Sequence, residues 1–144
     1  MSFFYPLKDS SLRKRDIKEG INTLLSGRVT MSQKTTNFEN YFKNKMNLKN
    51  AIMVNSGSSA NLLALQCLIN PYRKKRLKPG DHVLLPALCW STTLWPIVQS
   101  GLKPIFVDID INTFNISLKD LKKKITKKTK ALMLVHVLGN STNM

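Results

Sequence analysis

A run of small and polar residues between two apolar segments is the part of this sequence best suited to chemistry. Residues 51–54 are mostly apolar and predict a short buried strand, and the residues from Ala60 onward favour a helix that begins near Ser58. A turn from a strand into a helix exposes the first N–H groups of the helix, which favour an anion such as a phosphate. Gly57 has no Cβ to block close approach, and Ser58 and Ser59 add hydroxyl donors. An ordinary turn with a serine cap fits the same residues, and the spacing alone leaves both interpretations open.

Two common phosphate-binding motifs are absent from this turn. It does not match the G-x-G-x-x-G pattern of dinucleotide-binding folds, and no G-K-[ST] follows as in a P-loop. A phosphate-bearing cofactor or substrate, held by backbone and hydroxyl groups, remains as its ligand.

Trp90 is the second candidate, because a large aromatic residue near an anion site could stack on a planar heteroaromatic ring. Taken alone, Trp90 and Trp95 fit the packing of a core better. His136 follows an apolar run and could line a crevice, although a single histidine is more often structural. Asp108 and Asp110 are interpreted as turn residues, since no third ligand lies nearby to complete a metal site.

The elements that would position these residues alternate between strand and helix. Continuous apolar runs predict further buried strands at 82–86, 104–108 and 131–136. Helices are expected at about 11–25, 36–46, 58–69, 92–100 and 117–125, the first two with apolar stripes that predict core contacts. This order is typical of an α/β fold with a parallel sheet covered on both faces. The loops at the carboxyl ends of the strands, where ligands bind in such sheets, are 55–59, 87–91, 108–110 and 136–140.

Composition restricts the class of protein. The chain has 144 residues, of which 42% are hydrophobic and 22% charged, as in soluble globular domains. No run is long enough to span a membrane, and two cysteines among apolar neighbours, Cys67 and Cys89, predict reduced core residues of a cytoplasmic protein. The net charge of +15 keeps a second hypothesis open, a basic α/β module that binds nucleic acid without catalysis. The basic clusters lack interleaved aromatic residues, which favours a solvated face over that hypothesis.

Several segments in a fixed order resemble the DegT-type sugar aminotransferase family, a branch of the fold-type I pyridoxal-phosphate enzymes. These segments are spread across nearly the whole chain. They are YPL at 5–7, VNSGSSANLL at 54–63, KPGD at 78–81, PALCWSTT at 86–93, FVDID at 106–110 with NI at 115–116, and TKA at 129–131 leading to HVLGN at 136–140. The resemblance implies a three-layer sandwich of parallel strands, the large domain of fold type I, here truncated and preceded by two N-terminal helices. It divides the chain into an N-terminal helical segment, 1–50, and the first part of the cofactor-binding domain, 51–144.

Carried over by position, the resemblance implies that Gly57, Ser58 and Ser59 hold the phosphate of pyridoxal or pyridoxamine 5'-phosphate and that Trp90 stacks on the pyridine ring. Details of the loops look most like the 4-keto-6-deoxy-sugar 3-dehydratases, in which a histidine replaces the cofactor-binding lysine. The implied partners are a nucleotide-linked keto-sugar and an amino donor, glutamate, with a homodimer in the full-length form and no membrane. The expected role is surface polysaccharide or O-antigen biosynthesis.

The chain departs from the family in its catalytic residues. The family's aspartate for the pyridine nitrogen and its lysine or histidine lie beyond Met144, so no catalytic residue is assigned here. We therefore expect an N-terminal fragment that is inactive alone, and the choice between dehydratase and aminotransferase stays open.

Overall fold

The computed structural model describes residues 12–144, which form two compact units divided between residues 53 and 54. The first unit contains the helices α1 (Lys14–Leu25) and α2 (Gln33–Lys45). Both were predicted, although α1 follows Arg13 as its N-cap and begins later than the expected residue 11. The YPL segment lies outside the described residues. Within residues 12–144, none of the helices combines the length and apolar character needed to cross a bilayer.

The apolar stripes of these two helices are not core residues, contrary to expectation. No residue of α1 or α2 is buried, and Ile17, Leu24 and Tyr41 are each more than half exposed. Polar contacts at the surface connect parts of this unit. The Lys34 ammonium donates to the Glu19 carboxylate between the helices and lowers the pKa of Glu19, and Glu39 accepts the Met53 amide.

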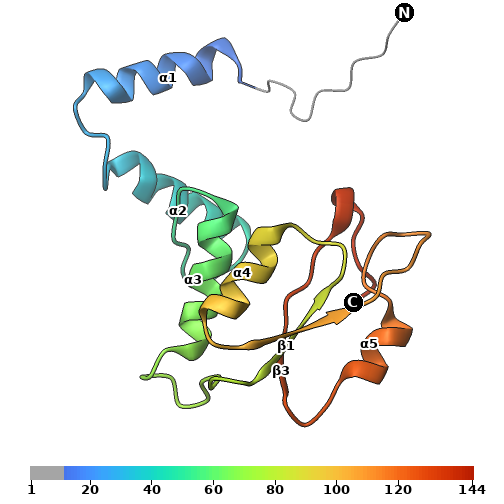
Figure 1. The fold of residues 1–144 in the computed structure, drawn as a ribbon. Coiled ribbons are helices and arrows are strands. Elements are labelled where there is room, and N and C mark those ends of the chain that lie inside the picture. Colours follow the sequence, from blue (N-terminus) through green and yellow to red (C-terminus); the bar gives the residue numbers. More distant parts are fainter. Residues whose placement is uncertain (1–11) are drawn as a thin grey trace, which may run out of the picture. The chain divides into compact units, whose positions relative to one another are not determined.

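The second unit is built on a three-stranded parallel sheet. Its strands are β1 (His82–Pro86), β2 (Lys103–Val107) and β3 (Thr129–Leu132), in the spatial order β2-β1-β3. Central β1 is almost completely buried from Val83 to Pro86, as its unbroken apolar sequence predicts. The parallel sheet of the α/β prediction is therefore confirmed (Figure 1).

Helices cover both faces of this sheet. The helices α3 (Gly57–Ile69) and α4 (Ser91–Gln99) pack on one face, and α5 (Leu118–Lys124) lies on the other (Figure 1). Alternate residues of a strand point to opposite faces, so β1 supplies both cores. Val83 and Leu85 pack with Leu65 and Ile97, whereas Leu84 packs with Val107 in the second cluster.

The strand predicted at residues 51–54 is wrong. The segment forms no strand, and Ile52 and Met53 are 72% and 54% exposed. Its Met53 amide bonds to a side chain of α2 instead of to a neighbouring strand. The last strand is also shorter than predicted, since β3 ends at Leu132 and only the Met133 amide continues the pairing, to the Leu84 carbonyl.

The cysteines also differ from expectation. Both are free thiols, as predicted, but Cys67 is exposed and Cys89 is only half-buried. Helix α3 buries Leu65 instead of Cys67, so its apolar residues do not all face the core. Burial raises the pKa of the Cys89 thiol and keeps it protonated.

Asp120 connects α5 to the end of β2. Its carboxylate accepts the Asp108 amide and the Lys124 ammonium, each at 2.8 Å, and these contacts lower the pKa of Asp120. Because the folded pKa is depressed, the stabilisation is present above the ordinary pKa of an aspartate and is lost as the pH falls through the lowered value.

We expect Asp120→Asn to lower the free energy of unfolding at neutral pH and to lose this effect in acid. Urea unfolding of both proteins, followed from neutral to acidic pH, measures the difference. An Asp120→Asn effect of the same size throughout this range would contradict a role for the carboxylate charge.

Candidate functional site

The first turn of α3 presents free backbone donors. The Ser56 hydroxyl caps the helix by accepting the Ser59 amide at 3.2 Å, and the Ser59 hydroxyl donates to the Asn55 side chain at 2.6 Å. The amides of Gly57 and Ser58 have no hydrogen-bond partner among residues 12–144. No acidic side chain lies in this turn. The turn can therefore bind an anion through its backbone.

The surroundings of Gly57 are open. Its φ is not positive, so the backbone does not require glycine, and a Cβ built on it would meet no atom within 4 Å. The neighbouring Ser58 and Ser59 line an open groove of about 250 Å³. The opposite wall comes from α4, and the Asn61 side chain ties the two helices together by donating to the Thr92 carbonyl at 3.2 Å.

Trp90 does not pack in the core, which removes that alternative. It immediately precedes α4, and 71% of its surface is exposed. Its side chain lines a mainly apolar groove of about 470 Å³ together with Cys89, Phe114 and His136. Trp95 is likewise half exposed, and it lines the first groove beside Ser58.

The topology of the sheet explains where the second groove opens. The chain leaves β1 for α4 and β2 on one side, while β3 returns on the other side of β1. Adjacent parallel strands whose connections diverge in this way leave a crevice at their carboxyl ends. Trp90 follows β1 and His136 follows β3, so the predicted meeting of these two loops is confirmed.

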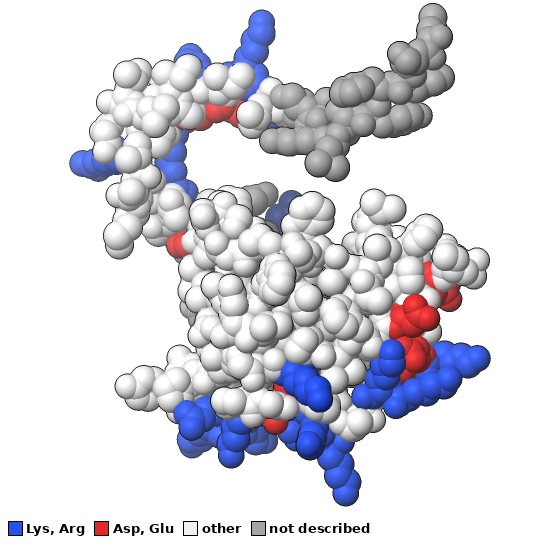
Figure 2. Space-filling view, viewed as in Figure 1, with Lys and Arg blue, Asp and Glu red and all other residues white. Residues whose placement is uncertain are grey.

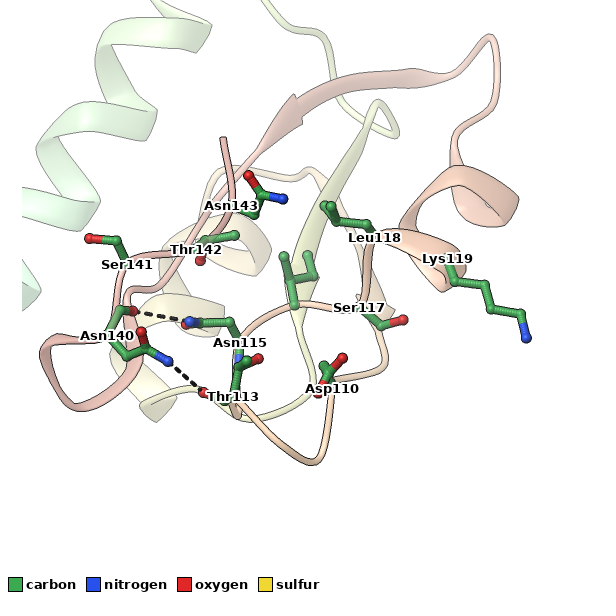
Figure 3. A pocket seen from close by; sticks show the side chains of 11 residues that line it. Asp110, Thr113, Asn115, Ser117, Leu118, Lys119, Asn140, Ser141, Thr142 and Asn143 are labelled. Carbon is green, nitrogen blue, oxygen red and sulfur yellow. Dashed lines mark hydrogen bonds between the residues drawn. The ribbon is translucent and has the colours of Figure 1, made fainter.

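The four predicted loops do not all share one cavity. Of residues 55–59, Ser58 and Ser59 line the first groove, and the loops of Trp90 and His136 form the second. Asp110 and Asn140 line a third pocket of about 380 Å³ (Figure 3). The Asp110 carboxylate accepts the Asn112 amide at 2.8 Å, which makes Asp110 a turn residue.

Sequence reasoning missed two buried polar residues beside these loops. Asn115 and Thr142 are 4% and 5% exposed and bond to the backbone of residues 135–140. Phe114 was missed as well, although its positive φ of 58° marks a constrained turn. No local sequence pattern predicts these hydrogen bonds, because they join residues up to 25 positions apart.

Basic residues gather away from the carboxyl ends of the strands. Figure 2 shows Lys and Arg along one edge of the second unit. Lys103 and Lys128 lie at or just before the start of β2 and β3, and Lys122, Lys123 and Lys124 end α5. The amino ends of parallel strands lie at the opposite end of the sheet from their carboxyl ends, where the grooves open. The positive charge therefore does not concentrate at the candidate site.

Comparison with known proteins identifies relatives over almost the whole chain. A sequence model of the DegT/DnrJ/EryC1/StrS aminotransferase family matches residues 10–144. The GDP-4-keto-6-deoxy-D-mannose 3-dehydratase of Escherichia coli O55:H7 is 43% identical over 139 residues, which are 96% of this chain and 36% of that protein. The GDP-perosamine synthase of Escherichia coli O157:H7 is 34% identical over 146 residues, 98% of this chain and 37% of that protein.

Solved structures agree with this relationship. The Escherichia coli GDP-4-keto-6-deoxy-D-mannose-3-dehydratase with bound hydrated PLP superimposes with a TM-score of 0.90 at 43% identity, covering 97% of this chain and 36% of that one. A Streptococcus pneumoniae protein described as a sugar aminotransferase, in its PLP form, gives a TM-score of 0.84 at 28% identity, covering 98% and 34%. The chain thus spans about a third of the length of the relatives it matches.

Proposed function

Because this chain belongs to the DegT/DnrJ/EryC1/StrS aminotransferase family, we propose that it forms part of an enzyme that modifies nucleotide-linked sugars with pyridoxal or pyridoxamine 5'-phosphate. The observation that carries the proposal is the pair of unpartnered amides, on Gly57 and Ser58, beside the open Cβ position of Gly57. Relatives with the same fold are solved with PLP or in PMP form.

In this proposal the first turn of α3 holds the phosphate of the cofactor. The amides of Gly57 and Ser58 donate to phosphate oxygens, and the Ser58 hydroxyl adds a further donor, whereas the Ser59 hydroxyl donates to Asn55 and orders the turn. Ser59 is oriented by its bonds to Asn55 and Ser56, so its position is fixed before a ligand arrives. The donor set fits a dianion, and the first turn contains no competing carboxylate.

Trp90 provides a face for the pyridine ring. Its exposure and the apolar groove around it fit a planar aromatic ligand, which gains from stacking and from exclusion of water. When bound, the cofactor supplies the electron sink that sugar amination and dehydration require. The residues of this chain bind and orient it.

The substrate class follows from the relatives. Their names include 3-dehydratases of GDP- and dTDP-linked sugars, a GDP-perosamine synthase and proteins of lipopolysaccharide and spore-coat polysaccharide biosynthesis. We propose a nucleotide-linked 4-keto-6-deoxy sugar as the substrate, glutamate as the amino donor and a homodimer as the assembly. Identity is higher to the 3-dehydratase, at 43%, than to the perosamine synthase, at 34%, which favours dehydration.

Replacing Trp90 tests the cofactor site. We expect Trp90→Ala to weaken pyridoxamine 5'-phosphate binding by about 5- to 150-fold, the equivalent of about 1–3 kcal/mol for a lost aromatic stack. Trp90→Phe keeps a ring and should retain most of the affinity. Equilibrium dialysis of the 144-residue chain against the cofactor gives the dissociation constants.

Tyr72→Ala is the matched control, because Tyr72 is another exposed aromatic residue, 95% exposed and outside both grooves. It should bind like the unsubstituted chain. Equal affinities for Trp90→Ala and Tyr72→Ala would remove Trp90 from the proposed site.

A further inference from the structure

His136 is held in one tautomer by a backbone contact. The Thr142 amide donates to His136 Nδ1 at 3.1 Å. A backbone N–H can only donate, so Nδ1 must be unprotonated, and in the neutral ring the proton then lies on Nε2. Nε2 has no hydrogen-bond partner among residues 12–144.

The segment around His136 is fixed on both sides by buried polar side chains. The Thr142 hydroxyl donates to the Val135 carbonyl at 3.3 Å, and the side-chain Oδ1 of Asn115 accepts the Val137 amide at 3.1 Å. Asn115 also donates to the Asn140 carbonyl at 3.0 Å, one of the bonds drawn in Figure 3.

Burying a polar side chain raises the free energy of the folded state unless its hydrogen bonds are made. Asn115 and Thr142 make these hydrogen bonds with the backbone on either side of His136 and, through the Thr142 amide, with the His136 ring. The ring of that histidine lines the groove of Trp90, whereas Thr142, which engages Nδ1, lines the neighbouring pocket. The nitrogen left for a ligand in the groove is therefore Nε2.

We propose that His136 is a ligand-positioning residue whose Nε2–H donates to an acceptor oxygen on the aromatic ring that stacks against Trp90. This inference rests on the proposed function and adds the contact that sets the rotation of the ring. A neutral donor fixed in this way binds a ring oxygen, while the phosphate is held independently at the first turn of α3.

Two substitutions of His136 distinguish the role of Nδ1 from the role of Nε2. In His136→Asn the side-chain oxygen can still accept from Thr142, but no donor remains at the place of Nε2. In His136→Gln the amide nitrogen replaces the Nε2 donor. We expect His136→Asn to lose about 3- to 10-fold in affinity for pyridoxamine 5'-phosphate, the size of one net hydrogen bond, and His136→Gln to retain most of the affinity.

Inorganic phosphate is the control ligand, because it can use only the α3 site. Both variants should bind it as the unsubstituted chain does, with affinities measured by equilibrium dialysis. Normal cofactor affinity in His136→Asn, or equal losses in both variants, would overturn the role of Nε2. If the unsubstituted chain binds inorganic phosphate but not the cofactor, the proposed function itself fails, and the inference fails with it.

The tautomer can be measured without any ligand. Nitrogen-15 NMR of the ring should show an unprotonated Nδ1 and a protonated Nε2 at His136. His82 is the only other histidine, so a His82→Gln protein assigns the signals. A proton on Nδ1 of the neutral ring would contradict the inference whatever the cofactor does.

Discussion

Gly57→Ala is expected to weaken binding of pyridoxamine 5'-phosphate and of inorganic phosphate about 10-fold or more. We expect the new methyl group to hinder the approach of a phosphate to the free amides, and each lost hydrogen bond to a charged group costs about 1.5–3 kcal/mol. The fold should not suffer, since the Cβ meets no protein atom within 4 Å and the backbone needs no positive φ. The free energy of unfolding should stay equal or rise by up to about 1 kcal/mol, because alanine favours a helix.

Gly20→Ala provides the matched control for this experiment. Gly20 also lies in a helix, α1, and its Cβ would also meet no atom within 4 Å. It should gain the same small stability without any change in phosphate affinity. Parallel dialysis and urea unfolding distinguish the two variants, and a Gly57→Ala protein with normal affinity for both ligands would contradict a phosphate site at α3.

Leu85→Ala is expected to remove about 2–5 kcal/mol from the free energy of unfolding of the second unit, the usual cost of a buried leucine cavity. Leu85 is fully buried in β1 and packs in the cluster of Leu65 and Ile97. A loss of this size is a large fraction of the free energy of unfolding of a domain, which is about 5–15 kcal/mol. Urea unfolding followed by far-ultraviolet circular dichroism measures the change.

Leu132→Ala is the comparison, because Leu132 also lies in the sheet but is 44% exposed. Leu132→Ala should lower the free energy of unfolding clearly less than Leu85→Ala does. Similar losses for the two leucines would mean that the α3 and α4 side of the sheet is not packed as described.

The sequence predicted the elements whose signals are local. The unbroken apolar run of β1 agrees with the structure, because burial on both faces of the sheet acts on every residue of the strand. The strand β2 also forms where it was predicted, although only Val107 of it is buried. Residues 51–54 failed for a related reason. A short apolar run does not show whether a partner strand exists, and here Met53 bonds to Glu39 instead.

The candidate site was predictable in its positions but not in its connections. The start of α3 followed from the small and polar residues ahead of an apolar run, although no strand precedes it, and the loops of Trp90 and His136 followed from parallel-sheet topology. The exposure of Trp90 did not, because a tryptophan pattern does not distinguish core from groove. The bonds of Asn115 and Thr142 around His136 depend on loops that meet only in the folded chain.

The central position of β1 has a consequence for how the second unit folds. Among residues 12–144 it is the first strand in sequence and pairs with the other two, and its alternate residues pack on opposite faces. The helices on both faces pack against β1, so neither layer can dock before β1 has formed. If one layer unfolds, it exposes the same strand against which the other layer packs. The unit should therefore open as a whole, with the amides of β1 exchanging their hydrogens at the rate of global unfolding while the free amides of Gly57 and Ser58 exchange early.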